Sequence, residues 1–133
     1  MTAPARVRFA FSYYNREEQR HPELACFEIH SIARVREFYE LASPGLVKSI
    51  ARGPYAGISV ADLDTREIVL SRGATWLAAV HEIAHLLEWR INSNGSHDHR
   101  FARRVRRLAK LCQAHRFPEA DLVAHLEGTA PHL

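Results

Sequence analysis

The sequence predicts an α+β domain, and three observations carry that prediction. Residues 6–13 alternate apolar and polar side chains with the period of two that is typical of a strand. Two short β-rich runs, 55–61 and 66–71, flank a turn-like segment at 62–65, so we expect a hairpin there. Several longer runs have helical spacing. The chain has 133 residues, 47% of them apolar, which suits one domain with its own core.

Helices fill most of the remaining chain. Pro22 suits the first turn of a helix, and apolar residues continue at helical spacing until the Ser-Pro-Gly segment 43–45. Residues 46–54 carry no clear pattern. The further helices are expected at 75–91, with Thr75 as a possible cap, then at about 98–113 after a loop at 92–96, and at about 118–126.

Composition excludes several classes of protein. No apolar run approaches the roughly 18 residues of a membrane span, and the N-terminus lacks a secretory signal, so we expect a cytoplasmic protein. Two cysteines, Cys26 and Cys112, are too few for a zinc ribbon and are expected in the core. There is no nucleophile-elbow motif and no glycine-rich phosphate loop. Nine histidines direct attention to metal chemistry.

The residues that carry the chemistry form a His-Glu-x-x-His motif. His81 and His85 are four residues apart, so on a helix they lie on one face and can bind one metal ion. Glu82 lies about 100° round the helix from His81. From there it can reach a water on the metal, accept its proton and pass that proton to a leaving amine.

A catalytic zinc needs a third protein ligand, and three candidates lie close to the motif in the sequence. His97 and His99 both follow the loop at 92–96, which lets the chain turn back toward the motif. Glu88 lies one turn beyond His85 as a possible ligand or neighbour. The metzincin pattern is excluded, because it needs glycine at 88 and histidine at 91.

The motif, its spacer and the segment His97-Asp98-His99-Arg100-Phe101 together resemble the SprT-like (Spartan-type) zinc metalloproteases over about residues 50–112. The resemblance implies a minimal zincin-like domain in which His81, His85 and His97 hold Zn²⁺ and Glu82 is catalytic. The resemblance also implies that Phe101 is the aromatic residue of the family's second motif and packs in the core. Asp98 replaces the family's usual glycine but is a good helix cap. The family's cysteine-rich ribbon is absent from this sequence.

Together these observations predict one metallopeptidase domain over 1–133, with its core at about 6–126. We expect a small, mostly antiparallel sheet packed against the motif helix, and hydrolysis of peptide bonds in a protein or peptide substrate. Tyr55, His99 and Arg100 are candidates to stabilise the oxyanion. The basic helix from Arg100 to Lys110 could bind nucleic acid. The alternative function is a non-proteolytic nucleic-acid-binding protein with a structural or vestigial zinc site.

Overall fold

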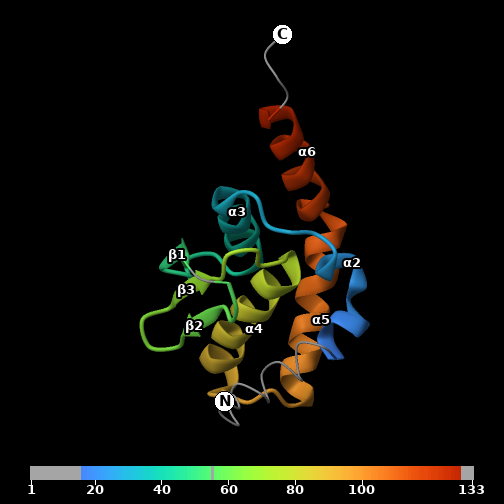
Figure 1. Ribbon diagram of the computed structural model, residues 1–133. Coiled ribbons are helices and arrows are strands. Elements are labelled where there is room, and N and C mark those ends of the chain that lie inside the picture. The colour runs from blue at the N-terminus through green and yellow to red at the C-terminus, as the bar shows by residue number, and fades with distance from the viewer. Residues whose placement is uncertain (1–15, 55, 130–133) are drawn as a thin grey trace, which may run out of the picture.

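The computed structural model describes residues 16–54 and 56–129, so the strand expected at 6–13 lies outside the described residues. The α+β class is confirmed. A small sheet lies on one side of the helix α4, and α5 lies on the other (Figure 1). Residues 16–20 are helical. The named elements follow in the order α2 (Pro22–Ala25), α3 (Ile32–Ala42), β1 (Ser49–Arg52), β2 (Val60–Asp62), β3 (Glu67–Leu70), α4 (Trp76–Asn92), α5 (His99–Ala114) and α6 (Phe117–Thr129).

The described sheet has the order β1-β3-β2. The expected hairpin is confirmed: β2 pairs antiparallel with β3, and the Asp62 carboxylate accepts hydrogen bonds from the backbone N–H groups of Asp64 and Thr65 in the turn. The expectation of a mostly antiparallel sheet is wrong for the described strands, because β1 pairs parallel with β3. That strand comes from residues 46–54, where no pattern was evident, and it takes the edge opposite β2.

The single helix expected before residue 43 is also wrong, because an extended segment separates α2 from α3. In that segment the Ile29 N–H donates to the Ala74 carbonyl at 2.9 Å, next to the start of α4. Ser31 then caps α3 by accepting from the Arg34 N–H at 3.4 Å. The apolar residues before and after the break face the same core, so their spacing still resembles one helix.

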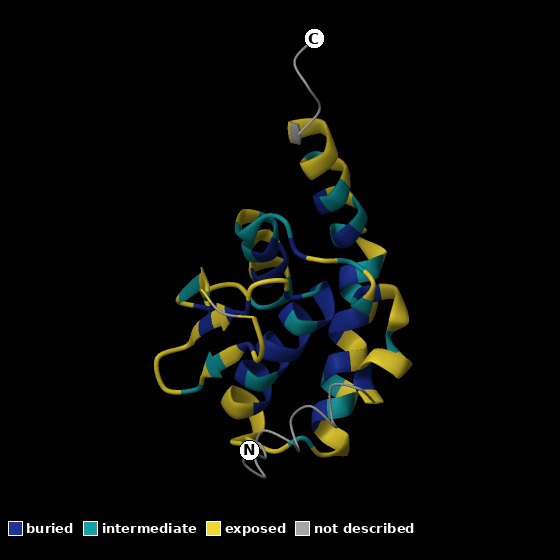
Figure 2. Cartoon of the chain, viewed as in Figure 1, coloured by how far each residue is buried: buried dark blue, intermediate teal, exposed yellow. Residues whose placement is uncertain are grey.

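Helix α4 is the centre of the core (Figure 2), and its buried side chains contact both the sheet and α5. The apolar stripe predicted for α5 is confirmed, with Cys112 fully buried in it. The expectation for Cys26 is wrong, since it is exposed at the end of α2. No helix within 16–54 and 56–129 combines the length and the apolar character needed to cross a bilayer.

Candidate metal centre

Helix α4 carries the His-Glu-x-x-His motif into the protein interior. His81 and Glu82 are each only 2% exposed, while His85 is half-buried. Apolar residues around them, such as Val80 and Ile83, are fully buried in the core. Burying a polar group without a partner is unfavourable, so each polar side chain on a helix that is buried on most sides is expected to have a partner or a function. Side chains that needed contact with water would therefore be unfavourable at the position of the motif.

Three histidines converge at one point. The Nε2 atoms of His81 and His85 lie 3.0 Å apart, those of His85 and His97 lie 3.0 Å apart, and those of His81 and His97 lie 3.3 Å apart. Their ring nitrogens could together hold one metal ion. The structure thus brings together the three residues that the sequence singled out, and they come from two separate segments of the chain.

The spacing of these nitrogens suits a small tetrahedral cation. Two ligands at the usual zinc–nitrogen distance of about 2.05 Å and the tetrahedral angle are about 3.3 Å apart. The observed separations of 3.0–3.3 Å are close to that value. Three imidazoles leave one tetrahedral position open, which is the arrangement of catalytic rather than structural zinc sites. The donor set therefore fits zinc.

A buried carboxylate from the start of the described chain orients His81. Glu17 Oε1 lies 2.9 Å from His81 Nδ1, and both side chains are 3% exposed. A carboxylate can only accept, so Nδ1 carries the proton and Nε2 presents its lone pair to the other two histidines. No sequence pattern indicated this role for Glu17. Glu17 stands in the mostly charged segment 16–20 and is 64 positions from its partner.

The loop between α4 and α5 places His97. Ser93 ends α4 in the left-handed conformation, and Asn94 then donates side-chain hydrogen bonds to Glu88 at 3.3 Å and to Asp98 at 3.1 Å. The Asp98 carboxylate caps α5 through the N–H groups of the next turn. Hydrogen bonds on both sides of His97 therefore fix the loop, and Asn94 is a positioning residue that sequence reasoning missed.

Phe101 packs against all three imidazoles. Its ring centroid lies 5.0 Å from that of His81, 4.4 Å from that of His85 and 5.1 Å from that of His97. The side chain is fully buried. The predicted place of Phe101 in the core is confirmed. Its ring limits the rotation of the three histidines and keeps water from one side of the cluster.

The same burial keeps the imidazoles neutral. Desolvation lowers the pKa of His81 to about 3. Desolvation, with smaller contributions from His81 and His97, lowers the pKa of His85 to about 2. The pKa of His97 is also lowered, chiefly by desolvation. Neutral imidazole is the form that binds metal, so all three rings are ready to act as ligands near neutral pH.

A cleft of about 380 Å³ opens beside the cluster, between α4 and β2. The three histidines and Glu82 line it together with residues of β2 and of the segment before it. Strand β2 is an edge of the sheet, paired only with β3 among the described strands. The backbone groups of β2 that no other described strand pairs with therefore border a space that also contains a carboxylate and the three convergent imidazoles.

The other candidates do not join the cluster. His99 is exposed at the first position of α5. The Glu88 carboxylate is used by Asn92, Asn94 and Arg104. Burial raises the pKa of Glu88, but these hydrogen bonds and the Arg104 charge together lower it. Arg100 lines a different hollow, and Tyr55 lies outside the described residues.

Helix, loop and cleft thus form one site around His81, His85 and His97, with Glu82 in its wall. Comparison of the chain with protein-family models, with curated proteins and with solved structures found no match, so the chemistry of the site is inferred from its own residues.

Proposed function

We propose that this protein is a zinc-dependent metallopeptidase of the SprT-like type. The observation that supports this most is the convergence of three histidine Nε2 atoms at 3.0–3.3 Å in the wall of a cleft that also contains Glu82. His81, His85 and His97 would hold Zn²⁺. Bound zinc supplies Lewis acidity, which makes water a usable nucleophile near neutral pH and polarises a carbonyl oxygen.

In this proposal Glu82 is the catalytic base. It is buried, it lines the cleft, and it follows His81 directly on the same helix. Its carboxylate accepts the proton of the attacking water and delivers that proton to the amide nitrogen as the peptide bond breaks. Glu17 and Phe101 act through the ligands, by fixing the tautomer and the rotation of the imidazoles.

The edge strand β2 offers a way to hold the substrate. An extended peptide can add to a free strand edge through main-chain hydrogen bonds, which need no particular sequence. In β2, Val60 is 54% exposed and lines the cleft. A peptide added along β2 would pass beside Glu82 and the three histidines. The substrate class is therefore an extended segment of a protein or peptide.

The first experiment measures bound zinc in the wild type and in three variants, Glu82→Gln, His97→Ala and His99→Ala. We expect about one zinc ion per chain in the wild type, in Glu82→Gln and in the matched control His99→Ala, because none of these changes removes one of the three proposed ligands. His97→Ala should lose zinc. Equal zinc in His97→Ala and the wild type would contradict the proposed ligand set.

Activity is then measured on a broad mixture of proteome-derived peptides. Zinc-loaded wild type and His99→Ala should cleave peptides, and Glu82→Gln should be slower by roughly 10²–10⁴-fold, the usual contribution of a general base. A zinc-loaded wild type that cleaves nothing in this mixture would contradict the peptidase proposal. That outcome would favour the alternative, a binding protein with a structural or vestigial zinc site.

A further inference from the structure

A second hollow lies near the end of α4, beyond the metal cluster. It has a volume of about 210 Å³ and lies between the end of α4 and α5. Four arginines line it, together with Glu88 and Asn92, and we call this group the arginine pocket: Arg100, Arg103, Arg104 and Arg107. Helical spacing of three and four residues places all four arginines on one face of α5.

The charge of this pocket is largely uncompensated. Arg104 Nε donates to Glu88 Oε1 at 2.9 Å, and that carboxylate also accepts from the side chains of Asn92 and Asn94. Glu88 is thus fully engaged. Within the described parts of the chain, the other three arginines have no acidic partner within 4.0 Å. Four arginines and one glutamate leave the pocket with a net charge of +3.

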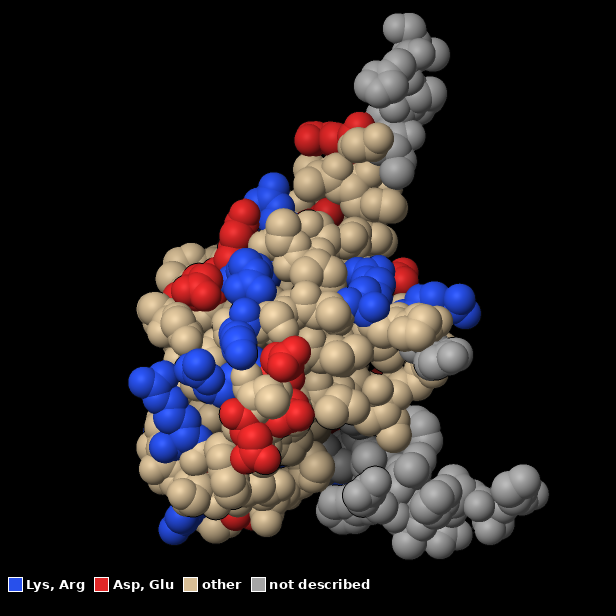
Figure 3. Space-filling model, turned by 90° about the vertical axis from the view of Figure 1, so that its left-hand side faces the viewer, with Lys and Arg blue, Asp and Glu red and all other residues tan. Residues whose placement is uncertain are grey.

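Such an arrangement is unfavourable for the helix by itself. Like charges three or four residues apart destabilise a helix, and the sequence from 100 to 110 contains six basic residues and no acid. On the side of the molecule that carries the sheet, basic and acidic side chains lie next to each other (Figure 3). The apolar stripe accounts for how α5 packs, but it does not account for arginine at four lining positions.

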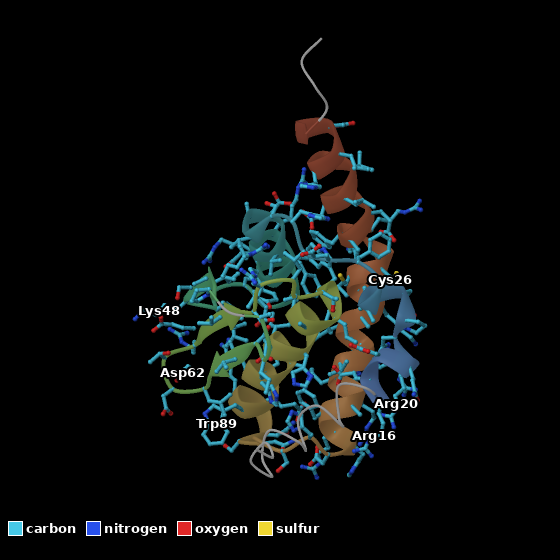
Figure 4. All side chains as sticks on the ribbon, in the orientation of Figure 1. Arg16, Arg20, Cys26, Lys48, Asp62 and Trp89 are labelled. Carbon is cyan, nitrogen blue, oxygen red and sulfur yellow. The ribbon has the colours of Figure 1, made fainter. Side chains whose placement is uncertain are left out.

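The basic surface continues beyond the pocket. Arg103 also lines a neighbouring hollow with Arg106 and with Arg20 from the helical residues 16–20. Figure 4 shows Arg20 beside the lower part of α5, in agreement with the shared lining of this hollow. Arg103 is therefore the link between two hollows of the same charge, so an extended polyanion could contact both.

We propose that the arginine pocket binds phosphate groups. The planar guanidinium group presents paired donors that match phosphate oxygens, and it stays charged at every physiological pH. Glu88 holds Arg104 in place by its Nε, so part of the pocket is ordered before a ligand arrives. The phosphates could belong to a nucleic-acid backbone or to a small phosphorylated molecule, since both present the same oxyanion.

The pocket lies close to the metal cluster, but phosphate binding in the pocket does not require a bound metal ion. His81, His85, Glu88 and Asn92 follow one another on a single stripe of α4. Glu88 comes three residues after His85, about 4.5 Å along the helix axis. A phosphate polymer bound in the pocket would therefore lie close to the cleft. Binding at the pocket requires neither zinc nor Glu82, so it can be tested separately from the proposed peptidase activity.

The test uses the whole chain and two triple variants with the same change in charge. One is Arg100→Gln/Arg103→Gln/Arg107→Gln, which spares the paired Arg104. The matched control is Lys48→Gln/Arg66→Gln/Arg72→Gln, at exposed positions on the sheet side. Far-UV circular dichroism checks that each variant is folded. The probes are a labelled single-stranded oligonucleotide of about 20 nucleotides at about 50 mM salt, measured by anisotropy, and inorganic pyrophosphate, measured by thermal shift.

We expect the pocket variant to bind the oligonucleotide at least about tenfold more weakly than the wild type, and the control to stay within about twofold. The slope of log affinity against log salt should become shallower by about two in the pocket variant, because each phosphate contact to a single strand contributes about 0.7. Stabilisation of the wild type but not the pocket variant by pyrophosphate, without oligonucleotide binding, would support a small phosphorylated ligand. Equal binding by both variants, or no binding of either probe by the wild type, would overturn the proposal.

Discussion

The metal cluster and the arginine pocket both border the same stripe of α4, but they differ in how far their side chains are buried. In the cluster, His81 is 2% exposed and its partner Glu17 is equally buried, and the hydrogen bond between them fixes the orientation of the His81 ring. In the arginine pocket, three of the four guanidinium groups are exposed and none of these three has an acidic partner among the described residues. Burial fixes the side-chain geometry of the metal cluster, whereas exposure leaves the positive charge of the arginine pocket available to a ligand.

The Glu88–Arg104 pair lies at the boundary of the two regions. Glu88 is 2% exposed, like the residues of the cluster, while Arg104 belongs to the arginine pocket. Through Asn94 the same carboxylate holds the loop that carries His97. One buried acid therefore supports both regions, by limiting the motion of a metal-binding loop and by anchoring one wall of an anion pocket. Four substitutions test this division, and the first is expected to have the largest effect.

Phe101→Ala should damage the buried region most. Removing a fully buried phenylalanine costs about 3–5 kcal/mol of unfolding free energy, and here it also frees three histidine rings to rotate. We expect both lower stability in urea and weaker zinc binding. Phe38→Ala is the control, because Phe38 is also fully buried but packs against Trp76 and Phe117. If both variants bind zinc equally well, Phe101 has no role in orienting the ligands.

Glu88→Gln should cost about 2 kcal/mol near pH 7, since it removes the charge from a buried hydrogen-bonded pair. Burial raises the pKa of Glu88, but its hydrogen bonds and Arg104 together lower it below the ordinary value. Stability from this ionised group is therefore complete above the unfolded pKa of about 4.3 and is lost as pH falls through the folded pKa. The difference in unfolding free energy between wild type and Glu88→Gln should shrink below about pH 4. A difference that is constant from pH 7 to 3 would contradict this.

The sequence predicts the features that depend on local spacing and misses those that depend on contacts between distant residues. The spacing within α4 and α5 is local, so helices, the apolar stripe and the two motif histidines could be read directly from the chain. The choice of His97 over His99 depended on a resemblance, because two histidines two residues apart look equivalent until a cap fixes where α5 begins. Glu17 could not be predicted, since its partner is 64 residues away. The break between α2 and α3 could not be predicted for the same reason. The hydrogen bond from Ile29 to Ala74 that stabilises it joins residues that are far apart in the sequence.

Asp98→Ala should have an intermediate effect that reaches the cluster. Loss of a helix cap costs about 1 kcal/mol, and here the cap also accepts a hydrogen bond from Asn94 in the loop before it. Ser31→Ala removes a cap from α3, a helix that carries none of the three histidines. We expect similar losses of stability from both variants in urea, and weaker zinc binding only in Asp98→Ala. Unchanged zinc binding in Asp98→Ala would show that the cap does not help to place His97.

Arg103→Gln should have the smallest effect, and it should be favourable. Arg103 has like-charged neighbours at 100, 106 and 107, each a repulsive pair of about 0.2–0.5 kcal/mol on a helix surface. The variant should therefore be slightly more stable than the wild type in thermal melts at low salt. Arg36→Gln on α3 is the control, because Arg36 has Glu40 four residues later and its loss should be neutral or unfavourable. Pyrophosphate should reduce the advantage of Arg103→Gln, since it should bind the four arginines of the wild type more tightly than the three left in the variant. An advantage that persists at high salt and with pyrophosphate would mean that repulsion between arginines is not its cause.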